Sequence, residues 1–402
     1  MRRMTRLLSV FLALVTLLTA LFALQPAALA ASKTAKDVVK NCKFKASKNQ
    51  DKTFQMKNTV LNKLWNGGKD GSLTVTLPNK QKAQGVMLAF STYVPKLVIE
   101  SMDSADHAQI AQFRDPYYNQ YIPFSQPVHS FRIRAAEDNT EAIRISRMNV
   151  LTEGTLPSWV QRWEQMEDGD AEILLIVTHP DDDILWFGGL LPTYAGELGK
   201  KVLVAYAETG YRWDRRNELL DALWLCGVKY YPYMQKGATG APDYTAYAVS
   251  CIRQYKPQVV VTQDVNGEYG HKAHLALVAA VIKAVVNYSG DAGAYPDSAA
   301  LYGAYQPQKL YVHLWKENQS TFDWSVKLSA FGGKTGMALA RAAFKKHASQ
   351  QNGRHAVIDH GAYDCRKLGL YWTNVGPDNT KTPDLLQNVM DDKISVAVTI
   401  QN

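Results

Sequence analysis

The stretch from Glu172 to Gly189, "EILLIVTHPDDDILWFGG", joins an uninterrupted apolar run to a histidine and three consecutive aspartates. An apolar run of this kind is typical of a parallel strand that is buried on both faces. The polar residues follow at its carboxyl end, where ligands bind in open α/β sheets. Carboxylates packed side by side repel one another unless a cation, a proton or water relieves them. The stretch therefore predicts a buried strand that leads into a ligand or metal site.

Apolar strands and helical segments alternate through the rest of residues 171–402. The strand pattern "KVLVAYA" (201–207) is followed by the helical pattern "RRNELLDALWLCG" (215–227). A second pair follows, with "PQVVVTQD" (257–264) before "HLALVAAVIKAVVNY" (274–288). This alternation predicts an α/β domain with a Rossmann-like parallel sheet and helices on both faces.

Residues 36–153 have a different pattern, with short β-branched runs separated by Gly, Pro, Asn and Asp. Examples are "GSLTVTLP" (71–78) and "AIRISRMNVL" (142–151). Strands at this spacing, without amphipathic helices between them, predict an antiparallel β-sandwich. Residues 154–170, which are punctuated by Gly and Pro, are expected to connect the two domains.

Residues 1–30 have a basic start, an apolar stretch and the small-residue end Ala28-Leu29-Ala30. This pattern predicts a signal peptide and a protein that is secreted or associated with the cell envelope, with an uncleaved anchor as the alternative. Removing this segment takes away three arginines and no acid, so the net charge falls from +8 to +5. A charge of this size is compatible with anionic envelope polymers. Because the chain lacks a basic stripe with interleaved aromatics, nucleic-acid binding is not expected.

The remaining chain contains four widely spaced cysteines, Cys42, Cys226, Cys251 and Cys365. Their spacing excludes a Cys-x-x-Cys metal or redox motif. Disulfides of an exported protein and buried free thiols both remain open.

A second group of polar residues follows the strand pattern at 257–264. His271 and His274 are three residues apart, so they share one face at the start of a helix. One of them, with His179 and an aspartate from the first strand end, would provide two histidines and a carboxylate, a set typical of hydrolytic zinc sites. In the alternative, Asp182 or Asp183 only caps a helix and the histidines lie on the surface.

The segments "THPDDD" (178–183) and "NGEYGHKAH" (266–274) resemble the two signatures of the PIG-L/LmbE-like N-acetylglucosaminyl deacetylase family. The likeness extends through "YAETG" and "HASQ" and covers about residues 171–375. It implies that His179, Asp182 and His274 bind zinc, with another divalent metal such as Fe²⁺ as the alternative. It also implies that Asp181 is the general base.

The resemblance assigns further roles. His271 matches the residue that stabilises the oxyanion and protonates the leaving amine, and Tyr269 matches a tyrosine that polarises the carbonyl. Arg215 or Arg216 and Glu218 match substrate-binding positions, and Asp183, which replaces Glu, matches a position that contacts substrate or supports the residues that do. The chain departs from the family pattern at Lys272-Ala273, which replaces Pro-Asp and removes a carboxylate that could orient a histidine.

The combined prediction is an exported zinc-dependent N-deacetylase that releases acetate from an N-acetylated amino sugar or glycan. The N-terminal sandwich loosely resembles discoidin-like and other carbohydrate-binding modules. Two alternatives remain: an amidohydrolase of an N-acylated small molecule, and a carbohydrate-binding surface protein without catalytic activity.

Overall fold

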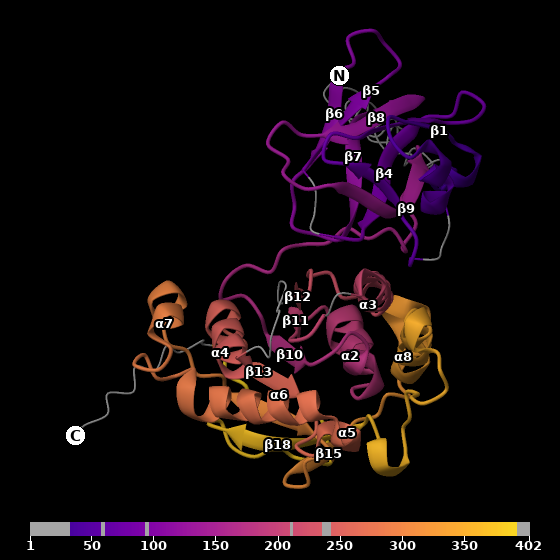
Figure 1. Cartoon of the computed structure of the whole chain (residues 1–402). Helices are drawn as coiled ribbons and strands as arrows, with labels where there is room; N and C mark the ends of the chain where they lie inside the picture. Colours follow the sequence, from indigo (N-terminus) through magenta and orange to yellow (C-terminus); the bar gives the residue numbers. More distant parts are fainter. Residues whose placement is uncertain (1–32, 58–60, 93–95, 210–211, 235–242, 392–402) are drawn as a thin grey trace, which may run out of the picture.

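The computed structural model describes residues 33–57, 61–92, 96–209, 212–234 and 243–391. It contains an antiparallel β-sandwich and an α/β domain, stacked one on the other (Figure 1). Both parts of the predicted fold class are confirmed. The expected signal segment, 1–30, lies outside the described residues. Among the described helices, none combines the length and apolar character that a membrane span requires.

The sandwich is built from two antiparallel sheets whose alternate residues face a shared core. Its five-stranded sheet has the order β1 (Lys43–Ala46), β3 (Ser72–Thr76), β8 (Ser130–Ala135), β5 (Leu97–Ser101) and β6 (Gln109–Phe113). Its four-stranded sheet has the order β2 (Trp65–Gly68), β9 (Ile143–Thr152), β4 (Ala83–Phe90) and β7 (Asn119–Val128). In β3, Leu73 and Val75 are buried in the core, because successive side chains of a strand point to opposite faces of the sheet.

The α/β domain contains one seven-stranded sheet. Its strand order is β12 (Tyr233–Met234), β11 (Val202–Tyr206), β10 (Ile173–Val177), β13 (Val259–Thr262), β14 (Lys309–His313), β18 (Lys367–Thr373) and β15 (Gln319–Thr321). Neighbouring strands from β12 to β14 are parallel, whereas β18 pairs antiparallel with both β14 and β15. Strand order reverses between β10 and β13, so this is the point where an open α/β sheet binds its ligand.

Helices cover both faces of this sheet. On one face lie α2 (Asp182–Leu185), α3 (Trp213–Leu225) and α8 (Gly336–Phe344), while α4 (Tyr244–Tyr255) and α6 (Lys272–Lys283) cover the other. The short helices α5 (Gly267–Gly270) and α7 (Pro296–Tyr302) complete the set, with a two-stranded hairpin of β16 (Lys327–Leu328) and β17 (Lys334–Thr335). β10 consists of Ile, Leu and Val and is buried throughout, because both of its faces are covered.

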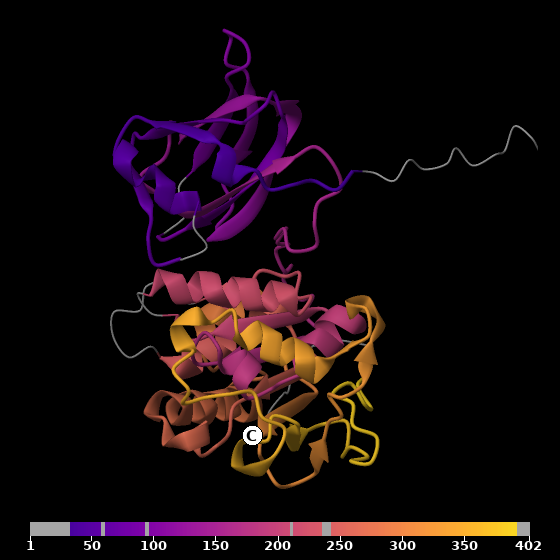
Figure 2. The ribbon, with the colours of Figure 1, turned by 90° about the vertical axis from the view of Figure 1, so that its right-hand side faces the viewer.

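Helix α3 also lies along the sandwich, as the view in Figure 2 shows. Asn217 donates a hydrogen bond to the Phe90 carbonyl (3.1 Å), and Asp221 forms a two-point ion pair with Arg147 (2.7 Å for each contact). Tyr117 packs on Tyr231 with ring centroids 4.3 Å apart. The two domains therefore share a packed, hydrogen-bonded junction.

All four cysteines are buried free thiols. Of the two alternatives left open by their spacing, the structure shows the unpaired one.

We expect Asp221→Ala to weaken the junction, because it leaves the guanidinium of Arg147 largely buried without its partner. The side chains of Arg147 and Asp221 are only 14% and 18% exposed. The free energy of unfolding, measured by denaturant titration, should therefore fall by about 2–4 kcal/mol. As a control, Asp70→Ala removes the exposed pair with Lys48 and should cost less than about 1 kcal/mol. Equal losses in the two variants would contradict a stabilising role for the junction pair.

Candidate active site

The ends of β10 and β13 bring the two groups of polar residues together. These strands pair in parallel, with Ile176 opposite Thr262, so the segments that follow them leave the sheet side by side. His179 follows β10, and His274 lies in the first turn of α6, which begins after a short loop from β13. The sheet register therefore places a histidine from each segment at one point.

His179, Asp182 and His274 are in mutual contact. The Nδ1 atom of His179 lies 3.0 Å from Nε2 of His274, and each of these nitrogens lies 3.3 Å from Oδ2 of Asp182. Ligands bound to a tetrahedral zinc ion at about 2.0–2.2 Å lie about 3.3–3.6 Å apart. The three atoms thus have nearly the spacing that such an ion requires, and their chemistry fits a divalent metal.

The carboxylate of Asp182 is held from both ends. Its Oδ1 accepts a hydrogen bond from the Trp186 indole (2.9 Å), and its Oδ2 accepts one from the backbone N–H of His179 (2.7 Å). Burial favours the neutral acid, but the two imidazoles outweigh it and hold the pKa of Asp182 well below its usual range. Asp182 is therefore a fixed anion.

Both imidazoles have a polar partner on their far side. Nε2 of His179 lies 3.3 Å from the carboxylate of Glu208, and Nδ1 of His274 lies 3.0 Å from the Gln263 amide nitrogen. The oxygen of the same Gln263 amide accepts hydrogen bonds from the backbone N–H (2.9 Å) and the hydroxyl (2.7 Å) of Thr178, which fixes the amide beside His274.

Asp181 directly precedes α2, and its side chain makes no capping hydrogen bond to the first turn of the helix. Its backbone φ of 117° is unusual for a residue other than glycine and turns the carboxylate away from the helix. Arg215 donates to that carboxylate at 2.7 Å and to the Pro180 carbonyl at 2.6 Å. Burial, together with the charge of Asp182, raises the pKa of Asp181 to about 8, although Arg215 opposes the shift.

The expectation that Asp183 contacts substrate is not supported by its position. Its side chain is completely buried beneath the site, so a ligand cannot reach it. Burial raises the pKa of Asp183 to about 7, and the neighbouring Tyr206 hydroxyl offsets this only in part. The three aspartates therefore differ in environment: the imidazoles favour the anionic form of Asp182, whereas burial disfavours the charged form of Asp181 and Asp183.

His271 and Tyr269 line the open side of the site. The ring of His271 lies 4.6 Å from that of His274 and 4.9 Å from that of His179, measured between centroids. Its Nδ1 is buried and has no hydrogen-bond partner among the described residues. Burial and the two neighbouring histidines lower the pKa of His271. Tyr269 is 47% exposed, with its ring 5.8 Å from both His271 and His274.

The structure separates Arg216 and Glu218 from this group. Arg216 donates to the Ser91 carbonyl of the sandwich at 3.0 Å and its guanidinium lies over the Tyr118 ring. Glu218 accepts hydrogen bonds from the backbone N–H (2.9 Å) and the hydroxyl (2.6 Å) of Ser349. Their roles in substrate binding stay predictions, whereas Arg215 contacts the acid cluster, Asp181–Asp183, through Asp181.

Sequence reasoning missed the residues that support the site from behind. Glu208 and Gln263 both lie one or two residues beyond a parallel strand, so the strand-end rule applied to every strand would have found them. A third support is Glu268, which has a φ of 60° and pairs with the buried His313 at 2.9 Å. This pair holds the loop that carries Tyr269 and His271.

Comparison with known proteins gives a family for the central part of the α/β domain. The PIG-L family model, described as GlcNAc-PI de-N-acetylase, matches residues 174–285. A curated relative from Geodermatophilus obscurus is named 1D-myo-inositol 2-acetamido-2-deoxy-alpha-D-glucopyranoside deacetylase. It is 28% identical over an alignment of 179 residues, and the match covers 35% of this chain and 60% of that protein.

Two solved structures resemble the two domains. N,N'-diacetylchitobiose deacetylase from Pyrococcus horikoshii covers 46% of this chain and 72% of its own, with 17% identity and a TM-score of 0.35. The structure titled CpGH89CBM32-6, produced by Clostridium perfringens, covers 29% of this chain and 100% of its own, with 14% identity and a TM-score of 0.26. The chain therefore contains a PIG-L family domain at residues 174–285, and the contacting residues His179, Asp182 and His274 all lie within it.

Proposed function

We propose that this protein is a zinc-dependent N-deacetylase that hydrolyses the acetamide group of an N-acetylglucosamine-type amino sugar. The observation that carries the proposal is the contact of Asp182 with His179 and His274 at the topological switch point of a PIG-L family domain. The chain spans only 60% of the Geodermatophilus relative, whose name specifies a 2-acetamido sugar linked to inositol. That relative supports the choice of an acetamido sugar as substrate class.

His179, Asp182 and His274 would hold the metal. A bound zinc ion supplies a Lewis acid that polarises the amide carbonyl and makes water more acidic. His271 is the other candidate ligand, because its ring nitrogen lies within 4.8 Å of those of His179 and His274. We assign the third position to Asp182, because its oxygen already contacts both imidazoles and its anionic form is stabilised there.

The remaining groups divide the proton transfers. Asp181 accepts the proton of the attacking water, and a pKa that burial raises suits a general base at neutral pH. His271, whose ring lies beside those of His179 and His274, would donate a proton to the departing amine. The exposed Tyr269 hydroxyl is placed on the open side, where it can donate a hydrogen bond to the carbonyl oxygen.

We also propose that the protein is exported, on the basis of the signal pattern in residues 1–30. An extracellular location would give it access to envelope glycans. N-terminal sequencing of protein recovered from the culture medium and from membranes distinguishes a cleaved signal from an uncleaved anchor.

Removal of the metal should abolish acetate release from N-acetylglucosamine derivatives, and added zinc should restore it. The measurement combines dialysis against a strong chelator, metal analysis and an acetate assay, with the apo-protein's melting curve as the control for folding. Full turnover by protein shown to be free of metal would contradict the site assignment.

Variants of neighbouring acids should separate metal binding from proton transfer. Asp182→Ala should lose bound zinc, whereas Asp181→Asn should retain it and lose turnover by about 10²-fold or more. Zinc content and kcat are measured on both variants. If Asp181→Asn loses the bound zinc and Asp182→Ala retains it, the roles of the two acids are reversed.

Arg215 should set the pH at which the general base becomes active. Since Arg215 lowers the pKa of Asp181, Arg215→Met should raise it. The base works only when deprotonated, so the acid limb of kcat/KM should move to higher pH by about one unit. Arg216→Met removes the same charge from the next residue, which contacts the sandwich, and should leave the limb in place. An identical limb in wild type and Arg215→Met would rule out this coupling.

A further inference from the structure

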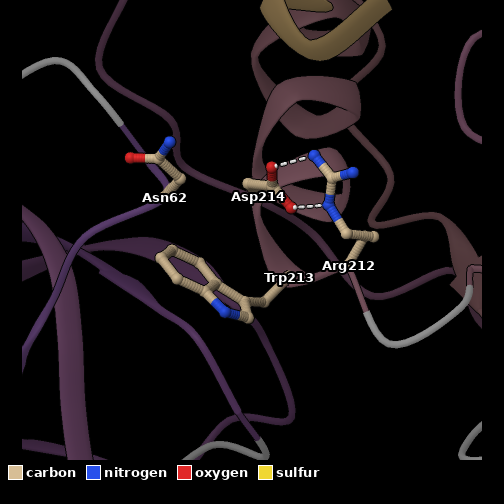
Figure 3. A pocket seen from close by; sticks show the side chains of 4 residues that line it. All are labelled: Asn62, Arg212, Trp213 and Asp214. Atoms are coloured by element: carbon tan, nitrogen blue, oxygen red, sulfur yellow. Dashed lines mark hydrogen bonds and ion pairs between the residues drawn. The ribbon is translucent and has the colours of Figure 1, made fainter.

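A pocket of about 310 Å³ opens where the start of α3 meets the sandwich (Figure 3). It is lined by Asn62, which precedes β2 in the sandwich, and by Arg212, Trp213 and Asp214 of the α/β domain. Both domains therefore contribute to it. Junctions between domains are frequent sites of small-molecule binding.

The lining combines an aromatic face with planar polar groups. Figure 3 shows the Trp213 ring on one side, Asn62 across from it, and the ion pair of Arg212 with Asp214 beside them. In this pair, Nε and Nη2 of Arg212 lie 2.8 Å and 2.5 Å from the two oxygens of Asp214. The pocket thus offers an apolar surface for C–H groups, with donors and acceptors at its rim for hydroxyl groups.

The charges in the pocket favour a neutral ligand. The hydrogen bonds from Arg212 lower the pKa of Asp214, so the carboxylate stays ionised at neutral pH. Paired with the Arg212 guanidinium, it leaves the pocket with no net charge. The pair therefore gives no net attraction for an ion, and the hydroxyl groups of a neutral sugar can bond to both partners.

The Trp213 side of the pocket is held firmly. Asn217 donates to the Trp213 carbonyl at 3.2 Å and to the Phe90 carbonyl at 3.1 Å, so one side chain ties the start of α3 to the sandwich. Less ordering is needed when a ligand binds to groups that are already fixed.

The pocket lies next to the candidate active site along the chain. Arg215, which contacts the Asp181 carboxylate, directly follows Asp214 in α3. The start of α3 therefore borders both places, the aspartates through Arg215 and the pocket through Trp213 and Asp214.

From these observations we propose that the pocket is a second sugar-binding subsite, which holds a neutral pyranose of a glycan next to the one that is deacetylated. This proposal rests on the proposed deacetylase function. It makes the sandwich a wall of the extended binding site and gives the enzyme a preference for oligosaccharides over monosaccharides.

The test compares kcat/KM for the trimer triacetylchitotriose with kcat/KM for monomeric N-acetylglucosamine. In Trp213→Ala and in Asn62→Ala, we expect the trimer-to-monomer ratio to fall by about tenfold, equal to about 1.4 kcal/mol. Trp159→Ala, which removes an exposed tryptophan outside the pocket, is the matched control and should keep the wild-type ratio. An unchanged ratio in both pocket variants overturns the proposal.

Calorimetric binding of N-acetyl-chitotetraose to the zinc-loaded full chain separates this proposal from the deacetylase function. Weaker binding by Trp213→Ala and Asn62→Ala supports the subsite, even if the wild type releases no acetate and the deacetylase proposal fails. Equal affinity in wild type and variants, or no binding by the wild type, overturns the subsite. Because Asn62 is exposed on the sandwich, its variant keeps the test valid if Trp213→Ala does not fold.

Discussion

The contact of one carboxylate, Asp182, with two imidazoles from neighbouring strand ends is the constraint on which the rest of the site depends. It requires β10 and β13 to be adjacent and in register, and the reversal of strand order places them so. It also divides the three consecutive aspartates. Asp182 remains ionised between the histidines, whereas burial raises the pKa of both Asp181 and Asp183. Like charge can therefore be gathered at this strand end because each acid has a different neighbour.

Helix α3 links that site to the sandwich. Successive side chains of a helix point about 100° apart, so neighbouring residues of one short segment can contact two different domains. Arg215 turns to the acid cluster, whereas Arg216 and Asn217 bond to backbone carbonyls of the sandwich. Two neighbouring tyrosines of the sandwich face this junction, Tyr117 on Tyr231 and Tyr118 under the guanidinium of Arg216. The sandwich thus supports the helix that positions Arg215.

The sequence allowed a correct prediction of both domains and of the groups that converge, because buried parallel strands have a distinct apolar pattern and their ends mark the ligand site. It did not predict β18 and β15, whose antiparallel pairing depends on tertiary contacts. Which of Arg215 and Arg216 contacts Asp181 depends on how α3 is rotated about its axis between the two domains, and the sequence does not show that. The burial of Asp183 followed from the tight turn into α2, which adjacent positions in a motif do not reveal.

We expect His179, Asp182 and His274 to form the metal site, which anomalous diffraction at the zinc edge from zinc-loaded crystals can test. One strong peak should appear with Nδ1 of His179, Nε2 of His274 and Oδ2 of Asp182 about 2.0–2.2 Å away. His271 should lie nearby without binding the ion. A peak bound by His179, His271 and His274, with Asp182 outside the coordination sphere, would contradict the account, as would a peak elsewhere in the molecule.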